Sequence, residues 1–245
     1  MLKYDYQPGP KGTLIFIHGA GGNRTKWRNQ MASLPEGFGG LALDLEGHGE
    51  SEGEAPTEVK AYAAGAVECV RNISPPRPFV WVGHSLGGAI VMTVALIYPD
   101  MADYQILIGT GARLKVVPEN LEKLRNGIVD PAAKRLAYSP FTSDDLINAE
   151  IAADMKNDPR IAYHAMLACD QFDIIDQLSS ISIPSLLIVG KDDISTPPKY
   201  SEFLLDKLPQ ASLNIIEKAG HIIMLEQPAA VNEHIDRFLK EKVGS

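Results

Sequence analysis

The chain has 245 residues, of which 45% are hydrophobic and 22% are charged, and this composition indicates a globular protein with one large core. The formal net charge of −8, without a cluster of Lys and Arg, excludes a nucleic-acid partner. No apolar run reaches the roughly 20 residues that cross a bilayer, and residues 1–12 lack the apolar core of a signal peptide, so we expect a cytoplasmic protein without membrane insertion. The two cysteines, Cys69 and Cys169, are too few for a disulfide framework or a metal cluster, and we expect reduced thiols. Nothing in the sequence indicates an oligomeric state.

Apolar segments rich in β-branched residues alternate with helical patterns along the chain. The segments that predict strands cover residues 13–17, 40–43, 79–82, 105–108, 185–189 and 212–216. The patterns that predict helices cover residues 25–33, 57–71, 86–98, 199–207 and 229–242. Most strand segments are apolar at consecutive positions, as strands covered on both faces must be. The sequence therefore predicts an α/β fold with a mostly parallel central sheet and helices on both of its faces.

One stretch interrupts this alternation. Residues 112–180 contain no convincing strand, only helical patterns, and we interpret them as an all-helical cap inserted into a core of residues 1–111 and 181–245. Because the stretch follows one predicted strand and precedes the next, we expect it over the carboxyl edge of the sheet, where open α/β sheets bind ligands. Each of its four prolines is expected to start or stop a helix: Pro118, Pro131, Pro140 and Pro159.

The segment Gly83-His84-Ser85-Leu86-Gly87 lies directly between a predicted strand and an apolar helix. In that context a Gly-x-Ser-x-Gly segment is typical of a nucleophile elbow, because so sharp a turn leaves no room for side chains at the two glycine positions. The turn would lift the Ser85 hydroxyl out at the top of the sheet and place helix amide groups beside it. Ser85 is therefore the predicted nucleophile, and it needs a base that a third group orients.

The base is expected downstream of Ser85, since elbows of this kind are followed along the chain by an acid and then by a histidine. His221 comes after Gly220 in the loop that follows the last predicted strand, so it would emerge at the carboxyl edge of the sheet. His234 lies on the last predicted helix, beside its apolar stripe. His221 is therefore the predicted base.

Two adjacent carboxylates, Asp192 and Asp193, follow a predicted strand, and only one of them can point at the base. We favour Asp193, which has the spacing Gly-x-x-Asp-x-x-x-Pro through Pro197, and we keep Asp192 as the alternative. The acid would accept the proton-bearing ring nitrogen of His221 and fix its tautomer.

Further segments carry a resemblance to a known family. They are Ile17-His18-Gly19-Ala20-Gly21-Gly22, Asp44-Leu45-Glu46-Gly47-His48-Gly49-Glu50-Ser51, the segment around Asp193 and Gly220-His221. Together with the elbow they resemble the α/β-hydrolase superfamily, most closely its small esterase, lipase and C–C hydrolase branch with a single cap. The resemblance implies that the N–H groups of Ala20 and Leu86 form an oxyanion hole. We interpret four other polar residues as structural: His18, Asp44, His48 and His84.

The predicted site implies a serine hydrolase, a carboxylesterase or lipase-like enzyme that cleaves an ester of a small, mainly apolar substrate through an acyl-enzyme, with no metal or organic cofactor. Four residues of the predicted cap are candidates to line the substrate pocket: Met155, Tyr163, Met166 and Phe172. Two alternatives stay open. The same groups could serve a C–C bond hydrolase, a lyase or a cofactor-free perhydrolase, or the chain could be a non-catalytic ligand-binding protein of this fold.

Overall fold

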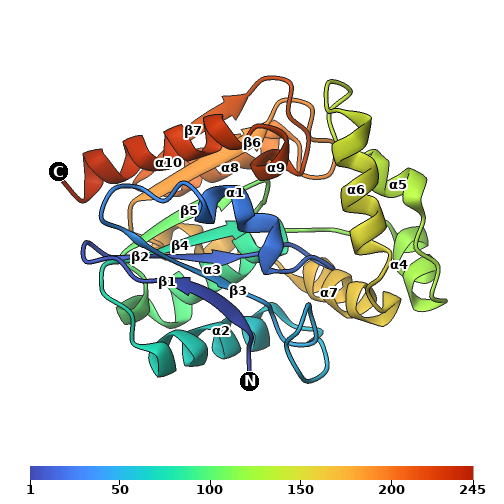
Figure 1. Ribbon diagram of the computed structural model, residues 1–245, viewed down its shortest axis with the longest axis horizontal. Helices are drawn as coiled ribbons and strands as arrows, with labels where there is room; N and C mark the ends of the chain where they lie inside the picture. Colours follow the sequence, from blue (N-terminus) through green and yellow to red (C-terminus); the bar gives the residue numbers. More distant parts are fainter. Residues whose placement is uncertain (245) are drawn as a thin grey trace.

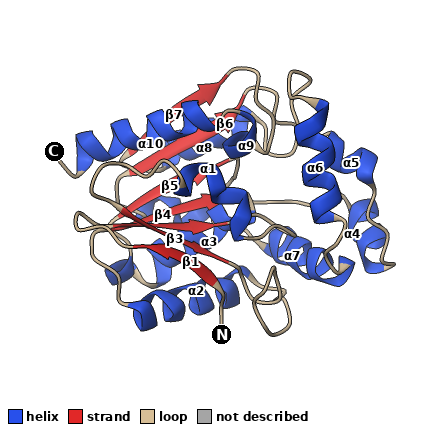
Figure 2. Cartoon of the chain, in the orientation of Figure 1, coloured by secondary structure: helices blue, strands red, loops and turns tan. Residues whose placement is uncertain are grey.

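A seven-stranded sheet forms the centre of the computed structural model, which describes residues 1–244 (Figure 1, Figure 2). Its strands are β1 (Tyr4–Gln7), β2 (Thr13–Ile17), β3 (Gly39–Leu43), β4 (Phe79–His84), β5 (Tyr104–Ile108), β6 (Ser185–Gly190) and β7 (Ala211–Ile216). Their order across the sheet is β1-β3-β2-β4-β5-β6-β7, and only β1 runs antiparallel to its neighbour. The predicted mostly parallel sheet is confirmed. The sequence misses β1, because this strand is short, lies at the edge of the sheet and exposes most of its side chains.

The helices outside the segment between β5 and β6 are η1 (Arg24–Trp27), α1 (Arg28–Met31), α2 (Val59–Ile73), α3 (Leu86–Ile97), η2 (Pro99–Met101), α8 (Pro198–Lys207), α9 (Ile223–Glu226) and α10 (Pro228–Lys242). The single helix predicted over residues 25–33 is instead a 3-10 turn followed by one turn of α-helix, because Trp27 leaves helical geometry at ψ 10°. One turn of helix, α9, is too short for a hydrophobic period and is not predicted. Among residues 1–244, no helix combines the length and the apolar character needed to cross a membrane.

Two hydrophobic clusters cover the opposite faces of the sheet. Because strand side chains alternate between faces, Ile15 and Ile17 of β2 belong to one cluster, whereas Leu14 and Phe16 belong to the other. Side chains of α2, α3 and α8 complete the first cluster, and those of α1, α9 and α10 complete the second. Figure 2 shows helices on both sides of the strands. This double cover is the reason that the parallel strands are apolar at consecutive positions.

The chain between β5 and β6, residues 109–184, is called the insertion below. It forms α4 (Pro118–Arg125), α5 (Pro131–Arg135), α6 (Asp144–Asp154), α7 (Pro159–Gln171) and η3 (Ile175–Ser180). In Figure 1, α4 to α7 stand together beyond one end of the sheet. Three of the four prolines occupy the first position of a helix, and Pro140 lies in the turn before α6.

The two halves of the insertion differ in how they are packed. Helices α6 and α7 bury side chains, among them Ile147 and Ala165. Helices α4 and α5 bury none. Because buried apolar contacts are the main source of local stability, α4 and α5 are the part of the insertion most easily displaced.

Candidate active site

A cavity of about 630 Å³ lies between the carboxyl edge of the sheet and the insertion. The loops that follow β2, β4, β6 and β7 all contribute to its lining, through Gly19 to Gly22, Ser85, Ser195 and His221. Parallel strands end at the same edge of a sheet, and for this reason residues more than 100 positions apart in the sequence meet here. The cavity has the size of an ordinary small-molecule site.

Ser85 occupies a strained turn between β4 and α3, with φ 53° and ψ −116°. A Cβ atom at Gly83 would lie 2.2 Å from the Gly87 carbonyl oxygen, and one at Gly87 would lie 2.2 Å from the Ile17 carbonyl oxygen. Neither position can therefore carry a side chain. The Ser85 amide donates a hydrogen bond to the Ile108 carbonyl oxygen at 3.0 Å, which ties the turn to β5.

His221 and Asp193 are joined by a hydrogen bond of 2.9 Å between Nδ1 of the ring and Oδ2 of the carboxylate. Asp193 is 3% exposed, and its Oδ1 accepts the backbone N–H groups of Ser195 and Thr196 at 2.8 and 2.9 Å. The Thr196 hydroxyl also donates to Oδ2 at 2.9 Å. Burial alone would raise the pKa of Asp193, but His221 and the Thr196 hydrogen bonds outweigh it, so the pKa lies below its ordinary value.

This arrangement fixes the tautomer of His221. A carboxylate can only accept, so Nδ1 carries the proton and Nε2 is left as the basic nitrogen. Ser85 and His221 line the same cavity, and among residues 1–244 no hydrogen bond joins their side chains. Such bonds are commonly long before a substrate is bound.

Asp192, the alternative acid, points to a different partner. Its Oδ2 accepts a hydrogen bond of 2.6 Å from the hydroxyl of Ser139, a residue of the insertion. The two neighbouring carboxylates therefore separate, Asp193 toward the imidazole and Asp192 toward the insertion.

Ala20, in the loop after β2, lines the cavity. The Gly19 carbonyl oxygen accepts hydrogen bonds from Nδ1–H of His18 at 2.8 Å and from the Gly22 amide at 3.0 Å. The peptide bond between Gly19 and Ala20 is trans, so the Ala20 N–H points away from these partners. Among residues 1–244, neither this amide nor that of Leu86 donates a hydrogen bond to another protein group.

The residues interpreted as structural are buried and make bonds that hold loops. Nε2 of His18 accepts the Leu45 amide at 3.1 Å, and burial with the neighbouring His48 lowers its pKa well below the ordinary value. Nε2 of His48 accepts the Gly21 amide at 3.3 Å. Nε2–H of His84 donates to the His221 carbonyl oxygen at 2.8 Å, and burial lowers the pKa of His84 to about 3. These rings are neutral near pH 7 and serve as fixed hydrogen-bonding groups.

Asp44, the fourth residue interpreted as structural, is fully buried at the start of the loop that follows β3. Its carboxylate accepts the backbone amides of Arg24 and Glu50 at 2.6 and 2.9 Å and forms an ion pair with the Arg24 guanidinium. It lies outside the cavity lining.

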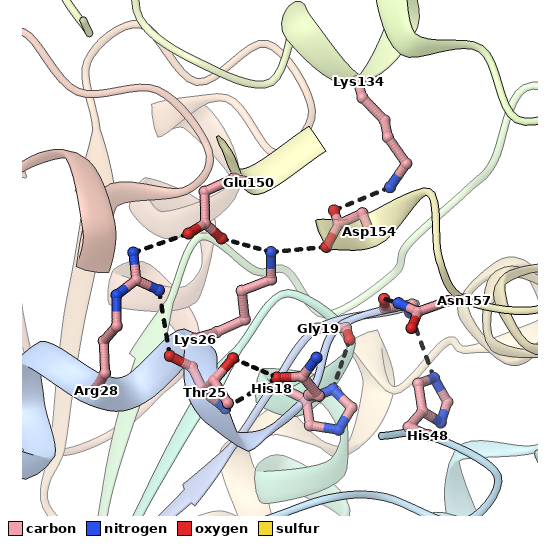
Figure 3. A network of polar contacts seen from close by, with 12 residues as sticks. His18, Gly19, Thr25, Lys26, Arg28, His48, Lys134, Glu150, Asp154 and Asn157 are labelled. Carbon is pink, nitrogen blue, oxygen red and sulfur yellow. Dashed lines mark hydrogen bonds and ion pairs between the residues drawn. The ribbon is translucent and has the colours of Figure 1, made fainter. Parts of the chain in front are cut away.

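A network of ion pairs ties the core to the insertion next to the loop that follows β2 (Figure 3). Lys26, which lines the cavity, lies 2.7 Å from carboxylate oxygens of both Glu150 and Asp154 of α6. Each carboxylate has a second cation, Arg28 at 2.8 Å from Glu150 and Lys134 at 3.0 Å from Asp154.

The segment that follows α6 also contacts the loop that carries Ala20. The side-chain amide of Asn157 donates to the Gly21 carbonyl oxygen at 3.0 Å. Together with the ion pairs of Lys26, this bond connects the insertion to core residues that line the cavity.

Of the four residues expected to line the pocket, the structure brings only Met166 to the cavity. Met155 follows α6 and is 44% exposed, whereas Phe172 is 6% exposed and packs in the hydrophobic core. Tyr163 lies one residue away from the stripe of α7 that faces the cavity, which consists of Pro159, Ala162, Met166 and Cys169. Burial raises the pKa of the Cys169 thiol to about 12, so this residue on the wall is protonated at neutral pH.

Several residues that support the site are not found by the sequence analysis. Thr196 stands three positions after Asp193, and this proximity could have suggested a local hydrogen bond. Lys26 and Asn157 act on partners more than 120 positions away and give no local signal. Among residues 1–244 no group of three or more His, Cys, Asp and Glu side chains could hold a metal ion.

The sheet order, the strained serine turn and the buried imidazole–carboxylate pair at the carboxyl edge define a class of protein. The chain belongs to the α/β hydrolase fold family, whose sequence model matches residues 12–228.

Individual relatives narrow the comparison. The chain is 31% identical to a solved thermophilic esterase, with a TM-score of 0.85 and coverage of 100% of this chain and 99% of that one. It is 28% identical to a lipase-esterase related protein from Clostridium acetobutylicum, with a TM-score of 0.88 and coverage of 97% and 99%. It is also 29% identical over 238 residues to a pimeloyl-(acyl-carrier protein) methyl ester esterase of Neisseria meningitidis, which covers 89% of this chain and 88% of the relative.

Proposed function

We propose that the protein is a serine hydrolase that cleaves carboxylic esters of small, mainly apolar substrates, with Ser85 as nucleophile, His221 as base and Asp193 as the acid that orients the base. The observation that carries the proposal is the 2.9 Å bond from His221 to Asp193 at the cavity that Ser85 also lines. Several relatives are named esterases, which supports ester cleavage, while others are named as a putative carbamate hydrolase and an enol-lactonase.

In the proposed first half-reaction, Ser85 Oγ attacks the ester carbonyl carbon while Nε2 of His221 accepts the hydroxyl proton. The carbonyl oxygen becomes an oxyanion, and the N–H groups of Ala20 and Leu86 stabilise it. The tetrahedral intermediate then expels the alcohol, which takes the proton from His221, and the acyl group remains on Ser85. Asp193 stabilises the imidazolium that exists between these steps.

In the second half-reaction, His221 removes a proton from water, which attacks the acyl-enzyme carbonyl carbon. The second tetrahedral intermediate expels Ser85, which regains its proton from His221, and the carboxylic acid leaves. Loss of one oxyanion donor typically costs about 3 kcal/mol of transition-state stabilisation, so the orientation of the Ala20 amide bears directly on the rate.

We further propose that residues 112–180 act as a cap domain over a core formed by residues 1–111 and 181–245. Support comes from the cavity lining, to which the insertion contributes apolar side chains such as Val117, Leu136 and Met166. An apolar wall of this kind favours an aliphatic acyl or alcohol group in the substrate.

The test of the proposed function is the Ser85→Ala variant assayed on a panel of p-nitrophenyl esters of graded acyl length. We expect the wild-type protein to hydrolyse short esters and to be labelled stoichiometrically by a fluorophosphonate, and we expect the variant to lose about 10⁶-fold in kcat and all labelling. Retained turnover in the variant contradicts the assignment. Weak ester turnover with strong activity on a vinylogous diketone, or with peroxide, indicates another reaction on the same groups. A wild-type protein that is not labelled at all indicates a ligand-binding member of the family.

A further inference from the structure

The loop that carries His221 is held by the insertion as well as by the core. Nδ1 of the ring is held by Asp193, and the His221 carbonyl oxygen accepts Nε2–H of His84 at 2.8 Å. The His221 amide, in contrast, donates to the carbonyl oxygen of Ala137 in the insertion, at 2.6 Å. The Thr196 hydroxyl also lies 3.3 Å from Nδ1, so one of the four polar contacts of this residue comes from a segment more than 80 positions away.

The residue before the base shows how closely that segment approaches. A Cβ atom at Gly220 would lie 2.6 Å from the Ala137 carbonyl oxygen and 2.6 Å from the Ser139 amide nitrogen. Only glycine fits this contact between two main chains. The insertion is therefore packed directly on the backbone of the base loop.

The carboxylate of Glu226, at the end of α9, joins the same two segments. It accepts the Gly220 amide at 3.1 Å, the Ser139 amide at 2.8 Å and the Thr142 hydroxyl at 2.5 Å. Hydrogen bonds to an ionised acceptor are roughly twice as strong as neutral ones. Among residues 1–244, no ion pair with Lys, Arg or His engages Glu226, so its negative charge is met by these neutral donors.

This part of the insertion has further attachments: the Tyr138 side chain is 8% exposed, and the Ala137 carbonyl oxygen accepts the His221 amide. Residues 136–143 link α5, which buries no side chain, to α6. The hydrogen bonds to Glu226 and the bond from Ser139 to Asp192 are the contacts by which core carboxylates hold the segment.

We propose that Glu226 is a positioning residue for the base: it clamps residues 137–142 of the insertion onto the His221 loop, so that the imidazole is held for proton transfer only while this segment is docked. The inference rests on the proposed function, because it concerns the base of that reaction. A misplacement of about 1 Å in a reacting group can cost roughly 100-fold in rate, and the loss falls on kcat more than on KM.

Two substitutions weaken the hydrogen bonds of Glu226 to different extents. Glu226→Gln keeps the shape of the side chain but replaces one acceptor oxygen by an NH₂ group that faces N–H donors, and we expect kcat to fall about 10- to 100-fold. Thr142→Val removes one hydroxyl donor without a change of volume, and we expect a loss of a few fold, which Thr142→Ser restores. Glu233→Gln, the same chemical change on an exposed position of α10, is the matched control and keeps wild-type kcat.

The measurements are kcat and KM on a p-nitrophenyl ester and the rate of Ser85 labelling by a fluorophosphonate, well below the unfolding temperature of each variant. A purely structural role lowers the unfolding temperature and leaves kcat and the labelling rate of the folded protein unchanged, and this outcome overturns the inference. If Glu226→Gln does not fold, the comparison of Thr142→Val with Thr142→Ser decides. If the wild-type protein neither turns over esters nor is labelled, the proposed function fails and the inference falls with it, whereas a fully active wild type with unaffected variants refutes the clamp alone.

Discussion

The turn that carries Ser85 and the loop that carries His221 lie at the same edge of the sheet but are held in different ways. The serine turn is fixed by its own glycines, by the main chain of neighbouring strands and by the Thr110 hydroxyl, which donates to the Ser85 carbonyl oxygen at 2.8 Å just after β5. The histidine loop receives its backbone contacts from both the core and the insertion, through His84 and Ala137. The position of Ser85 therefore follows from the sheet and the residues directly after β5, whereas that of His221 also depends on how the helical part of the insertion is docked.

The largest effect, on the free energy of unfolding, is expected at the turn that carries Ser85. Gly87→Ala, at the start of α3, would place a Cβ atom 2.2 Å from the Ile17 carbonyl oxygen, which is a main-chain atom at the end of β2 rather than a flexible side chain. We expect a loss of more than about 4 kcal/mol in the free energy of unfolding, measured by chemical denaturation. Gly65→Ala, in helix α2, is the control, because its nearest neighbour is the flexible end of Glu46 at 3.2 Å. Equal stability of the two variants would contradict the steric account of the turn.

The two adjacent carboxylates after β6 allow a contact within the core to be compared with a contact to the insertion, since Asp193 bonds His221 and Asp192 bonds Ser139. Asp193→Asn keeps the shape of the side chain but no longer favours the required tautomer of His221, and we expect kcat to fall about 10⁴-fold with folding intact. Asp192→Asn still offers an amide oxygen to the Ser139 hydroxyl, so we expect a loss of less than about tenfold. Ester kinetics on both variants measure the difference, and the reverse order of effects would exchange the roles of the two residues.

The ion pairs of Figure 3 test how firmly the insertion is attached near the Ala20 loop. Lys26→Met removes a buried ammonium from two carboxylates, each of which keeps a second cation, so we expect a loss of about 2–3 kcal/mol in unfolding free energy. Lys115→Met, at a cavity-lining lysine that is mostly exposed, is expected to change it by less than about 1 kcal/mol. Thermal unfolding of the two variants gives the comparison, which fails if they melt alike.

The smallest expected effect concerns the core contact of the histidine loop. Burial lowers the pKa of His84 to about 3, whereas an unfolded histidine titrates near 6.5, so in this interval the unfolded chain binds the proton and the native protein does not. Stability therefore falls as the pH drops from about 6.5 toward about 3, and the lowered pKa values of His18 and His48 act in the same direction.

The His84→Asn variant lacks one of the histidines that take up a proton on unfolding. We expect its unfolding free energy to depend less steeply on pH, by up to about 1.4 kcal/mol per pH unit, in urea titrations between pH 7 and pH 5. Identical slopes in the two proteins would show that His84 is already protonated in the native state.

The sequence is informative about the parts of the site that local sterics and strand order determine. Glycines at positions 83 and 87 between a strand and a helix point to Ser85, and the sheet edge makes His221 the natural partner. Spacing favours Asp193 and keeps Asp192 as the alternative, because either side chain of a loop can turn toward the imidazole. The bond from Ser139 to Asp192 and the bond from His221 to Asp193 show where the two side chains point, and the first depends on an insertion residue 53 positions away.

The sequence is least informative about which face of each insertion helix meets the cavity. Met155, Tyr163 and Phe172 are apolar enough to line a pocket, but the same apolar character suits a helix end or the core. The Lys26–Glu150 pair spans 124 positions, and no local pattern in the sequence indicates that these charges are buried together. Edge strand β1 escapes prediction for a related reason, since an exposed strand carries no hydrophobic period.

The lack of buried side chains in α4 and α5 bears on how this protein can change over generations. Substitutions there sacrifice little packing energy, so they are tolerated even in a marginally stable chain. Yet Val117, Leu124 and Ile128, on α4 or beside it, line the cavity. Natural drift and laboratory libraries can therefore reshape substrate preference in this helix pair while the sheet and the serine turn stay untouched.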